Sequence, residues 1–121
     1  MILVVDDSAT IRHQVRACLQ AAGHTVLEAE NGAIGLQKAK DYPIDMAIVD
    51  VNMPVMNGLE MLANLRGVDG KKSLPVFVLT TESSKELVAQ GKKHGATAWI
   101  VKPFKADVLA KGVAHVLARA A

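Results

Sequence analysis

Short apolar runs recur along the chain and are separated by longer segments of mixed polarity. Each run spans four or five residues, which suits a buried strand and is too short for a helix. The predicted strands are residues 2–5, 25–29, 46–49, 76–79 and 98–101. The second run contains Glu28, and this charge favours a position at the edge of a sheet.

Between the runs, apolar residues recur at the three- and four-residue spacing of helices. One such face combines Ile11, Val15, Cys18, Leu19 and Ala22; later faces combine Leu59, Leu62 and Leu65, and Leu109, Val113, Val116 and Leu117. The first predicted helix is capped by Asp7 or Ser8 and stops at Gly23. The others cover residues 32–40, 58–66, the segment from the loop at 80–84 to His94, and residues 106–117.

Five strand-and-helix units with nearly all-apolar strands require a parallel sheet that is covered on both faces through right-handed crossovers. A closed eight-stranded barrel needs far more than 121 residues. The pattern therefore predicts an α/β fold: a three-layer, doubly wound, flavodoxin-like sheet in the strand order 2-1-3-4-5. We expect residues 1–121 to form a single domain.

The composition argues against several classes of function. Half of the residues are apolar and 21% are charged, as in globular domains, and the net charge of +2 is dispersed. With 3% aromatic residues, these features argue against direct nucleic-acid binding. The sequence shows no signal-peptide pattern and no apolar run of membrane-spanning length. The single cysteine, Cys18, cannot form an internal disulfide and is predicted to be a buried, inert thiol, so we expect a reducing cytoplasm.

Polar residues follow four of the predicted strands: Asp6, Asp7, Asp50, Thr80 and Lys102. The carboxyl ends of parallel strands meet at one edge of a sheet, and in the order 2-1-3-4-5 Asp50 is central. Neighbouring strands lie about 4.8 Å apart, so short side chains reach Asp50 from the first and fourth strands. The fifth strand is about 9.6 Å away, a distance that needs a side chain as long as lysine.

Converging carboxylates need a cation. Two of them about 4 Å apart repel by about 4 kcal/mol at an effective dielectric constant near 20. Their hard oxygens favour Mg²⁺, whereas the four histidines are isolated and do not suit zinc. A carboxylate beside Mg²⁺, an ammonium and a hydroxyl suits a phosphoryl group, with the carboxylate as nucleophile. Taken singly, Asp50 and Thr80 can be helix caps and Lys102 a solvated lysine.

Four motifs stand at these strand ends: Val4-Val5-Asp6-Asp7-Ser8, Val49-Asp50-Val51-Asn52-Met53-Pro54 with Asn57-Gly58, Leu79-Thr80-Thr81, and Lys102-Pro103-Phe104. Together they resemble the receiver domain of two-component response regulators, closest to the single-domain chemotaxis type. The handedness and order of the predicted sheet are those of that family.

The resemblance implies phosphorylation of Asp50 by a histidine kinase in a Mg²⁺-dependent reaction. It implies that Asp6, Asp7, Asp50 and the backbone carbonyl of Asn52 hold the metal, and that Thr80 and Lys102 contact the phosphoryl group. The bond between Lys102 and Pro103 would be cis. Such a protein is not a conventional enzyme, although it catalyses its own phosphorylation and dephosphorylation.

Some positions depart from, or refine, the family pattern. Trp99 stands where the family more often has Tyr or Phe, and its larger indole opposes full inward rotation, leaving a surface contact as the other possibility. Thr81 replaces a smaller residue and narrows access to Asp50. Asn52 and Glu82 match the chemotaxis type at positions that tune dephosphorylation, so we expect a short-lived phosphoprotein.

With no output domain after Ala121, the resemblance implies signalling through a protein-binding surface on the fourth helix, fifth strand and fifth helix. Lys85, Val88, Trp99 and Lys105 would lie there, although an ordinary solvated face is the alternative. The target protein is unidentified, and we expect a monomer.

Three other functions stay open. The chain could be a phosphoryl carrier or phosphate sink without a dedicated partner. A hydrolase that uses an aspartyl phosphate would want an acid at position 52, where this chain has Asn52. A flavodoxin-like mononucleotide binder is disfavoured because Asp6 and Asp7 would repel a phosphate.

Overall fold

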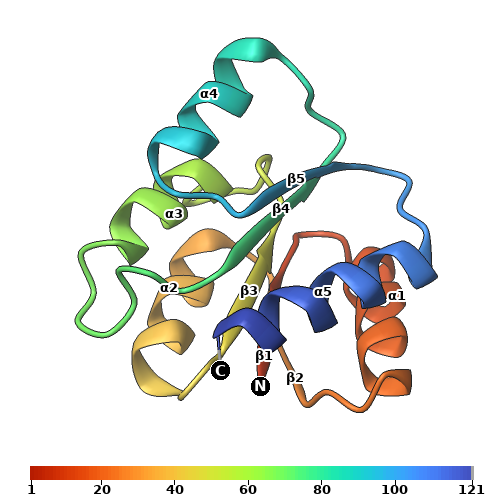
Figure 1. The fold of residues 1–121 in the computed structure, drawn as a ribbon. Helices are drawn as coiled ribbons and strands as arrows, with labels where there is room; N and C mark the ends of the chain where they lie inside the picture. The colour runs from red at the N-terminus through yellow and green to blue at the C-terminus, as the bar shows by residue number, and fades with distance from the viewer. Residues whose placement is uncertain (121) are drawn as a thin grey trace.

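The computed structural model describes residues 1–120, in which strands and helices alternate (Figure 1). The strands are β1 (Ile2–Val5), β2 (Val26–Ala29), β3 (Met46–Val49), β4 (Val76–Thr80) and β5 (Ala98–Val101). The helices are α1 (Ala9–Ala21), α2 (Gly32–Asp41), α3 (Gly58–Leu65), α4 (Lys85–Lys93) and α5 (Ala106–Ala120).

All strand pairs are parallel, and within these residues they form a five-stranded sheet in the order β2-β1-β3-β4-β5. The predicted fold class and strand order are confirmed. Residue 5 of β1 pairs with residue 49 of β3, so these strands end at the same level. Their carboxyl ends therefore deliver the following residues, Asp6 and Asp50, to one edge.

The sheet separates two apolar cores because successive strand residues point to opposite faces. Leu3 and Val5 face α2 and α3, whereas Ile2 and Val4 face α1 and α5 (Figure 1). The predicted inward leucines of α3 (Leu59, Leu62 and Leu65) are buried. Leu109 and Val113 of α5 are buried as predicted, and Val116 and Leu117 pack against the same core.

Local signals start the helices as expected. Ser8, rather than Asp7, caps α1 by accepting the Ile11 N–H at 3.3 Å, which leaves the Asp7 carboxylate free of capping. Asn57 and Glu60 form a reciprocal capping box at the start of α3. Ser84 caps α4 in the same manner as Ser8.

The outer edge of the sheet is covered by charged side chains. Glu28 of β2 is paired with Arg12, 3.3 Å between Nε and Oε1, and with Arg16. The Lys38 ammonium of α2 donates to the backbone carbonyl of Glu28 at 2.6 Å. The expected edge position of this strand is confirmed.

Some expectations need correction. β4 includes Thr80, and α5 continues past Leu117 to Ala120. Ala22 is exposed and serves as the C-cap of α1. Cys18 is partly exposed rather than buried, because it lies at the margin between α1 and the start of α5, where its thiol donates to the carbonyl of Ala106. Burial of this thiol is still enough to raise its pKa.

No helix within residues 1–120 combines the length and apolarity that crossing a membrane requires.

Candidate functional site

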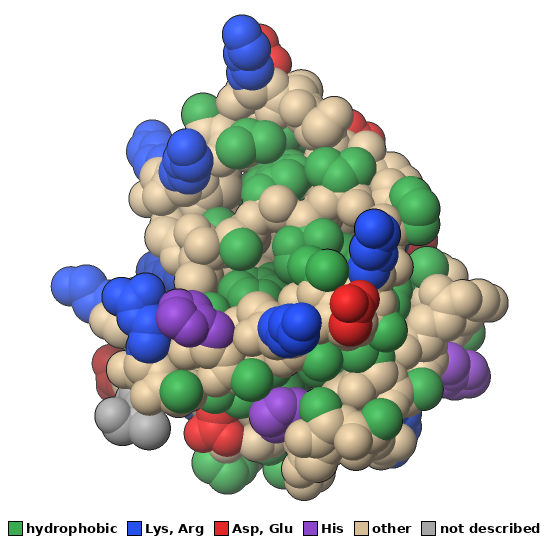
Figure 2. Space-filling model, turned by 45° about the vertical axis from the view of Figure 1, so that its right-hand side comes forward, with side chains coloured by type: hydrophobic (Ala, Val, Ile, Leu, Met, Phe, Trp, Pro, Cys, Tyr) green, Lys and Arg blue, Asp and Glu red, His purple; other side chains and the backbone are tan. Residues whose placement is uncertain are grey.

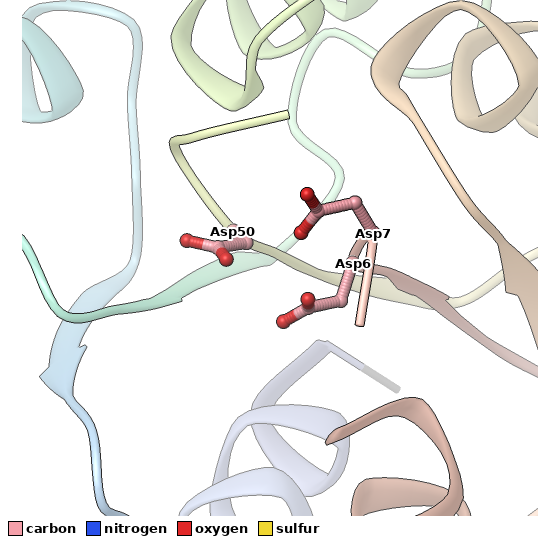
Figure 3. Close-up of side chains that lie close together, drawn as sticks. All are labelled: Asp6, Asp7 and Asp50. Carbon is pink, nitrogen blue, oxygen red and sulfur yellow. The ribbon is translucent and has the colours of Figure 1, made fainter. Parts of the chain in front are cut away.

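Three carboxylates meet where β1 and β3 end. Figure 3 shows Asp6, Asp7 and Asp50 side by side, and one carboxylate oxygen of each lies within 4.8 Å of the others. Asp6 and Asp50 are 3% and 8% exposed, whereas Asp7 is exposed. The predicted convergence of these acids is what the structure shows.

Backbone amides orient the two buried acids. The Ser8 N–H donates to Asp6 Oδ1 at 2.9 Å, and the Val51 N–H donates to Asp50 Oδ1 at 2.7 Å. The Ser8 amide belongs to the N-cap residue of α1 and the Val51 amide to the residue directly after Asp50, so the short turn that follows each strand also fixes the carboxylate. The remaining oxygens are directed toward a shared centre.

Lys102 fills that centre from β5. Its ammonium lies 2.8 Å from Asp6 Oδ2 and 2.9 Å from Asp50 Oδ2. The bond between Lys102 and Pro103 is cis, as the family resemblance implied. The Lys102 side chain is thus long enough to reach Asp50 from the end of β5, as the strand spacing predicted.

The charges of this centre depend on one another. Burial raises the pKa of Asp6, and hydrogen bonds from Lys102 and Ser8 only partly oppose that rise. Burial would lower the pKa of Lys102, but its hydrogen bonds to Asp6 and Asp50 outweigh burial, so the pKa of Lys102 is raised. The ammonium is therefore held in its charged form by the acids around it.

The donor set fits a hard divalent cation. The clustered oxygens all belong to carboxylates, and the Lys102 ammonium pairs with two of the three acids, Asp6 and Asp50. The Asp7 carboxylate is exposed to solvent, so it can bind a cation that keeps part of its hydration shell. Mg²⁺, which keeps several waters, suits such a half-open group of oxygens better than zinc does.

Thr80 lies at the end of β4, beside β3, and is completely buried. Its hydroxyl accepts the N–H of Glu82 at 3.3 Å. The hydroxyl therefore acts as an acceptor toward its own loop, and its O–H can still donate to a group on Asp50.

Glu82 connects this loop to two other segments. Its carboxylate accepts from Asn52 Nδ2 at 2.7 Å, and its backbone carbonyl accepts from Trp99 Nε1 at 2.8 Å. Sequence reasoning placed Asn52 and Glu82 in similar roles but did not predict that they touch. These partners come from separate loops, so no local pattern could have revealed the contacts.

Trp99 belongs to β5, is half-buried, and packs its ring against α4. Its ring packs with the cluster of Val51, Leu59 and Val78, and it lies so close to α4 that a Cβ at Gly91 would be 2.9 Å from Cζ3. The indole N–H, which the sequence left without a partner, has one in Glu82. Thr81 is exposed at the start of this loop.

Figure 2 shows the face over β5, where apolar side chains gather in a hollow and basic side chains stand around it, with an acidic one beside them. Val101 and Val108 contribute apolar surface, being 46% and 58% exposed. Of the four residues predicted for an output surface, Lys85 and Lys105 are exposed, and Val88 and Trp99 are half-buried. The structure does not bring these four to the carboxylate cluster, which lies at the strand ends.

Comparisons with known proteins agree with this geometry. Residues 2–114 match the family described as the response regulator receiver domain. The chain is 39% identical to the chemotaxis protein CheY homolog of Campylobacter jejuni over 118 residues, covering 96% of this chain and 91% of that protein. It is 35% identical to Protein PilH of Pseudomonas aeruginosa over 117 residues, covering 97% of each.

A similar solved structure is that of Vibrio cholerae chemotaxis protein CheY4. It superposes with a TM-score of 0.90 at 44% sequence identity, over 95% of this chain and 96% of that chain.

Proposed function

The chain belongs to the response regulator receiver domain family, and we propose that it is a stand-alone switch operated by phosphorylation of Asp50. Phosphorylation-dependent signalling is general in this family, whose chemotaxis-like members are not conventional enzymes. The observation that carries the proposal is the Lys102 ammonium, which is held between Asp6 and Asp50. A cation in that position is ready to neutralise a phosphoryl oxygen.

The proposed reaction uses a phosphohistidine of a histidine kinase as donor. A carboxylate oxygen of Asp50 attacks phosphorus, the bond from phosphorus to imidazole nitrogen breaks, and Lys102 pairs with the transferred group. Thr80 would then donate its O–H to a phosphoryl oxygen, and its movement toward that oxygen would alter the hydrogen bond that it accepts from the Glu82 N–H. Mg²⁺ held by Asp6, Asp7, Asp50 and the carbonyl of Asn52 would supply the remaining charge neutralisation.

A groove beside the site supports a protein donor rather than a small molecule alone. It lies between α1 and the loop from β5 to α5 and has a volume of about 590 Å³. Its lining is mainly apolar and includes Ile11, Pro103 and Phe104 together with Lys102. A helix bearing the donor histidine could bury apolar residues there while its imidazole reaches Asp50.

We propose that the output leaves through the α4, β5 and α5 face. Lys85, Val88, Trp99 and Lys105 mark it, and basic side chains around an apolar hollow favour an acidic amphipathic segment of a target protein (Figure 2). The path from Asp50 runs through Thr80 and Glu82 to the indole of Trp99. We propose a monomer that acts on a protein target and not on nucleic acid.

The decisive experiment is incubation with acetyl phosphate and Mg²⁺, followed by intact mass. Wild-type protein is expected to gain one phosphoryl group, and Asp50→Asn is expected to gain none. Asp45→Asn is the matched control, since Asp45 lies at the opposite end of β3 and pairs with the N-terminal amine. No mass gain in wild type, or an equal gain in Asp50→Asn, would refute the proposal.

The same preparation tests the lifetime of the phosphoprotein. Asn52 and Glu82 stand at the solvent side of the site and are hydrogen-bonded to each other, so water has access at that side. We therefore expect a short-lived phosphoprotein in Mg²⁺. A phosphoprotein that persists for many hours would contradict autodephosphorylation.

A further inference from the structure

Val55, in the loop that leads from Asp50 to α3, has a backbone conformation that does not suit its side chain. Its φ is 70°, in the left-handed region, where a β-branched residue is a genuine outlier. Its side chain is nevertheless 84% exposed. One exposed valine is ordinary on a protein surface, but one held at positive φ is not.

Hydrogen bonds hold the loop in this shape. The Met56 N–H donates to the carbonyl of Pro54 at 2.7 Å, which closes a three-residue turn with Val55 at its centre. Such a γ-turn with positive φ is rare and strained. The Met56 carbonyl in turn accepts the N–H of Gly32, at the start of α2, at 3.0 Å.

Close backbone packing prevents the loop from relaxing. A Cβ at Gly32 would lie 2.4 Å from the Met56 carbonyl oxygen, and one at Gly58 would lie 1.9 Å from the Asp50 carbonyl oxygen. The loop is thus held against α2 on one side and against the end of β3, at Asp50, on the other. Backbone strain persists where the surroundings enforce it, and such positions gather at functional sites.

The exposed Val55 side chain contributes little buried apolar surface to the fold. Asn or Gly would adopt this backbone more readily, and an exposed polar residue would also suit the solvent. This position therefore presents an apolar, stiff and exposed side chain on the loop that follows Asp50. A stiff side chain loses little conformational freedom when a partner covers it.

We propose that Val55 is a specificity-determining contact for the protein that donates the phosphoryl group, an inference that rests on the proposed function. Asp50 is 8% exposed, so a donor protein must cover the rim in order to bring its imidazole to the carboxylate. The apolar groove at Pro103 and Phe104 lies beside Lys102, and Val55 lies on the loop that follows Asp50. Apolar contacts on both loops would orient the donor over the polar centre.

The test compares a protein donor with a small one. Autophosphorylated histidine kinases are screened, and the one that transfers fastest to wild type is the donor; acetyl phosphate is the small donor. Val55→Asn and Val55→Gly are expected to slow transfer from the kinase about five- to tenfold, as loss of an interface anchor does. Val55→Ile keeps the apolar contact and is expected to stay within about twofold of wild type.

The rate of phosphorylation by acetyl phosphate is expected to be unchanged in all three variants. The unfolding midpoints of Val55→Asn and Val55→Gly should be no lower than that of wild type, because Asn and Gly tolerate positive φ. Tyr42→Asn is the control: this side chain is 44% exposed and precedes β3 at the opposite end of the sheet. It should leave both donors unaffected.

Unchanged transfer from the kinase would overturn the inference, because Val55 would then not contact the donor. Equal slowing with both donors would also overturn it, because Val55 would then affect the Asp50 site itself. Absence of transfer from every kinase, with acetyl phosphate still active, would contradict the protein donor and this inference with it. Failure of acetyl phosphate on wild type would instead refute the proposed function.

Discussion

At the scale of single residues, Glu82 is the point where three segments meet. Its N–H bonds the Thr80 hydroxyl, its carbonyl bonds the Trp99 indole, and its carboxylate bonds the Asn52 amide. A change at any of these contacts therefore reaches the others through one residue. Movement of Thr80 toward a phosphoryl group would lengthen its hydrogen bond from the Glu82 N–H and so disturb the backbone that holds the indole.

This connection can be read by fluorescence, because the chain has one tryptophan. Saturating phosphorylation is expected to shift the emission maximum of Trp99, as the Glu82 carbonyl moves and the indole environment changes. Thr80→Ala should still gain the phosphoryl group by mass but lose most of the emission change. Ser83→Ala, at an exposed residue of the same loop, is the control and should behave as wild type; unchanged emission of fully phosphorylated wild type would contradict the coupling.

The residues of the carboxylate centre could be predicted from sequence, and the Glu82 contacts could not. Asp6, Asp50 and Lys102 follow strands whose order is predictable, so their meeting is a consequence of topology. The bond from Trp99 to the Glu82 carbonyl depends on side-chain rotamers and on the path of a loop. Neither has a periodic signal, which is why Trp99 was left between two possible positions.

At the scale of elements, α4 is held mainly through its C-terminal end. Gly91 is its one buried residue in the described structure, and it packs on the Trp99 ring. Beyond it, the Arg66 side chain donates to the carbonyls of His94 and Gly95, each at 2.8 Å. The same guanidinium donates to the carbonyls of Lys71 and Leu74.

Arg66 thus joins the end of α4 to the connection between α3 and β4, and burial lowers its pKa. Arg66→Met keeps the aliphatic stem but leaves the carbonyls without a donor, so we expect a loss of about 2–3 kcal/mol in the free energy of unfolding. Amide exchange should accelerate most at the C-terminal end of α4. The measurements are urea denaturation and hydrogen exchange.

Arg119→Met is the control for Arg66→Met, since Arg119 is exposed on α5 and should change stability by less than about 0.5 kcal/mol. Equal stability of Arg66→Met and wild type would show that water replaces the guanidinium without loss. Sequence reasoning placed this helix between the loop at 80–84 and His94 but did not find this anchor, because an arginine that bonds carbonyls has no pattern along the chain.

At the scale of the whole molecule, the carboxylate centre draws on β1, β3 and β5, which span most of the sheet. An ion bound there should therefore stabilise the global fold and not one loop. At a Mg²⁺ concentration ten times its Kd, linkage predicts a gain of about 1.4 kcal/mol in the free energy of unfolding. Thermal or urea unfolding with and without Mg²⁺ measures it, and a chelator should reverse it.

Asp7→Asn should lose most of this Mg²⁺ gain, because it removes a carboxylate from the cluster without disturbing a buried hydrogen bond. Asp69→Asn, which alters an exposed acid between α3 and β4, should keep the gain in full. The same Mg²⁺ response in Asp7→Asn and wild type would refute the assignment of the cluster as a metal site.

The global topology was the most predictable feature, since the alternation of apolar runs and helical faces allows few arrangements. Helix ends were less predictable: α5 continues to Ala120 because nothing at Leu117 stops it, and Gly or Pro is absent from that stretch of the sequence. The predicted burial of Cys18 was wrong because the apolar face of α1 is wider than the part of that face that packs against the sheet.

The covering of β2 has a consequence for how the protein behaves at high concentration. An unprotected sheet edge is a template for aggregation, because a strand from another molecule can add to it. Here the Lys38 ammonium already occupies the Glu28 carbonyl, and Arg12 and Arg16 crowd the same strand. An incoming strand would have to expel these cations, so crowding should favour dispersed molecules over fibrils grown from this edge.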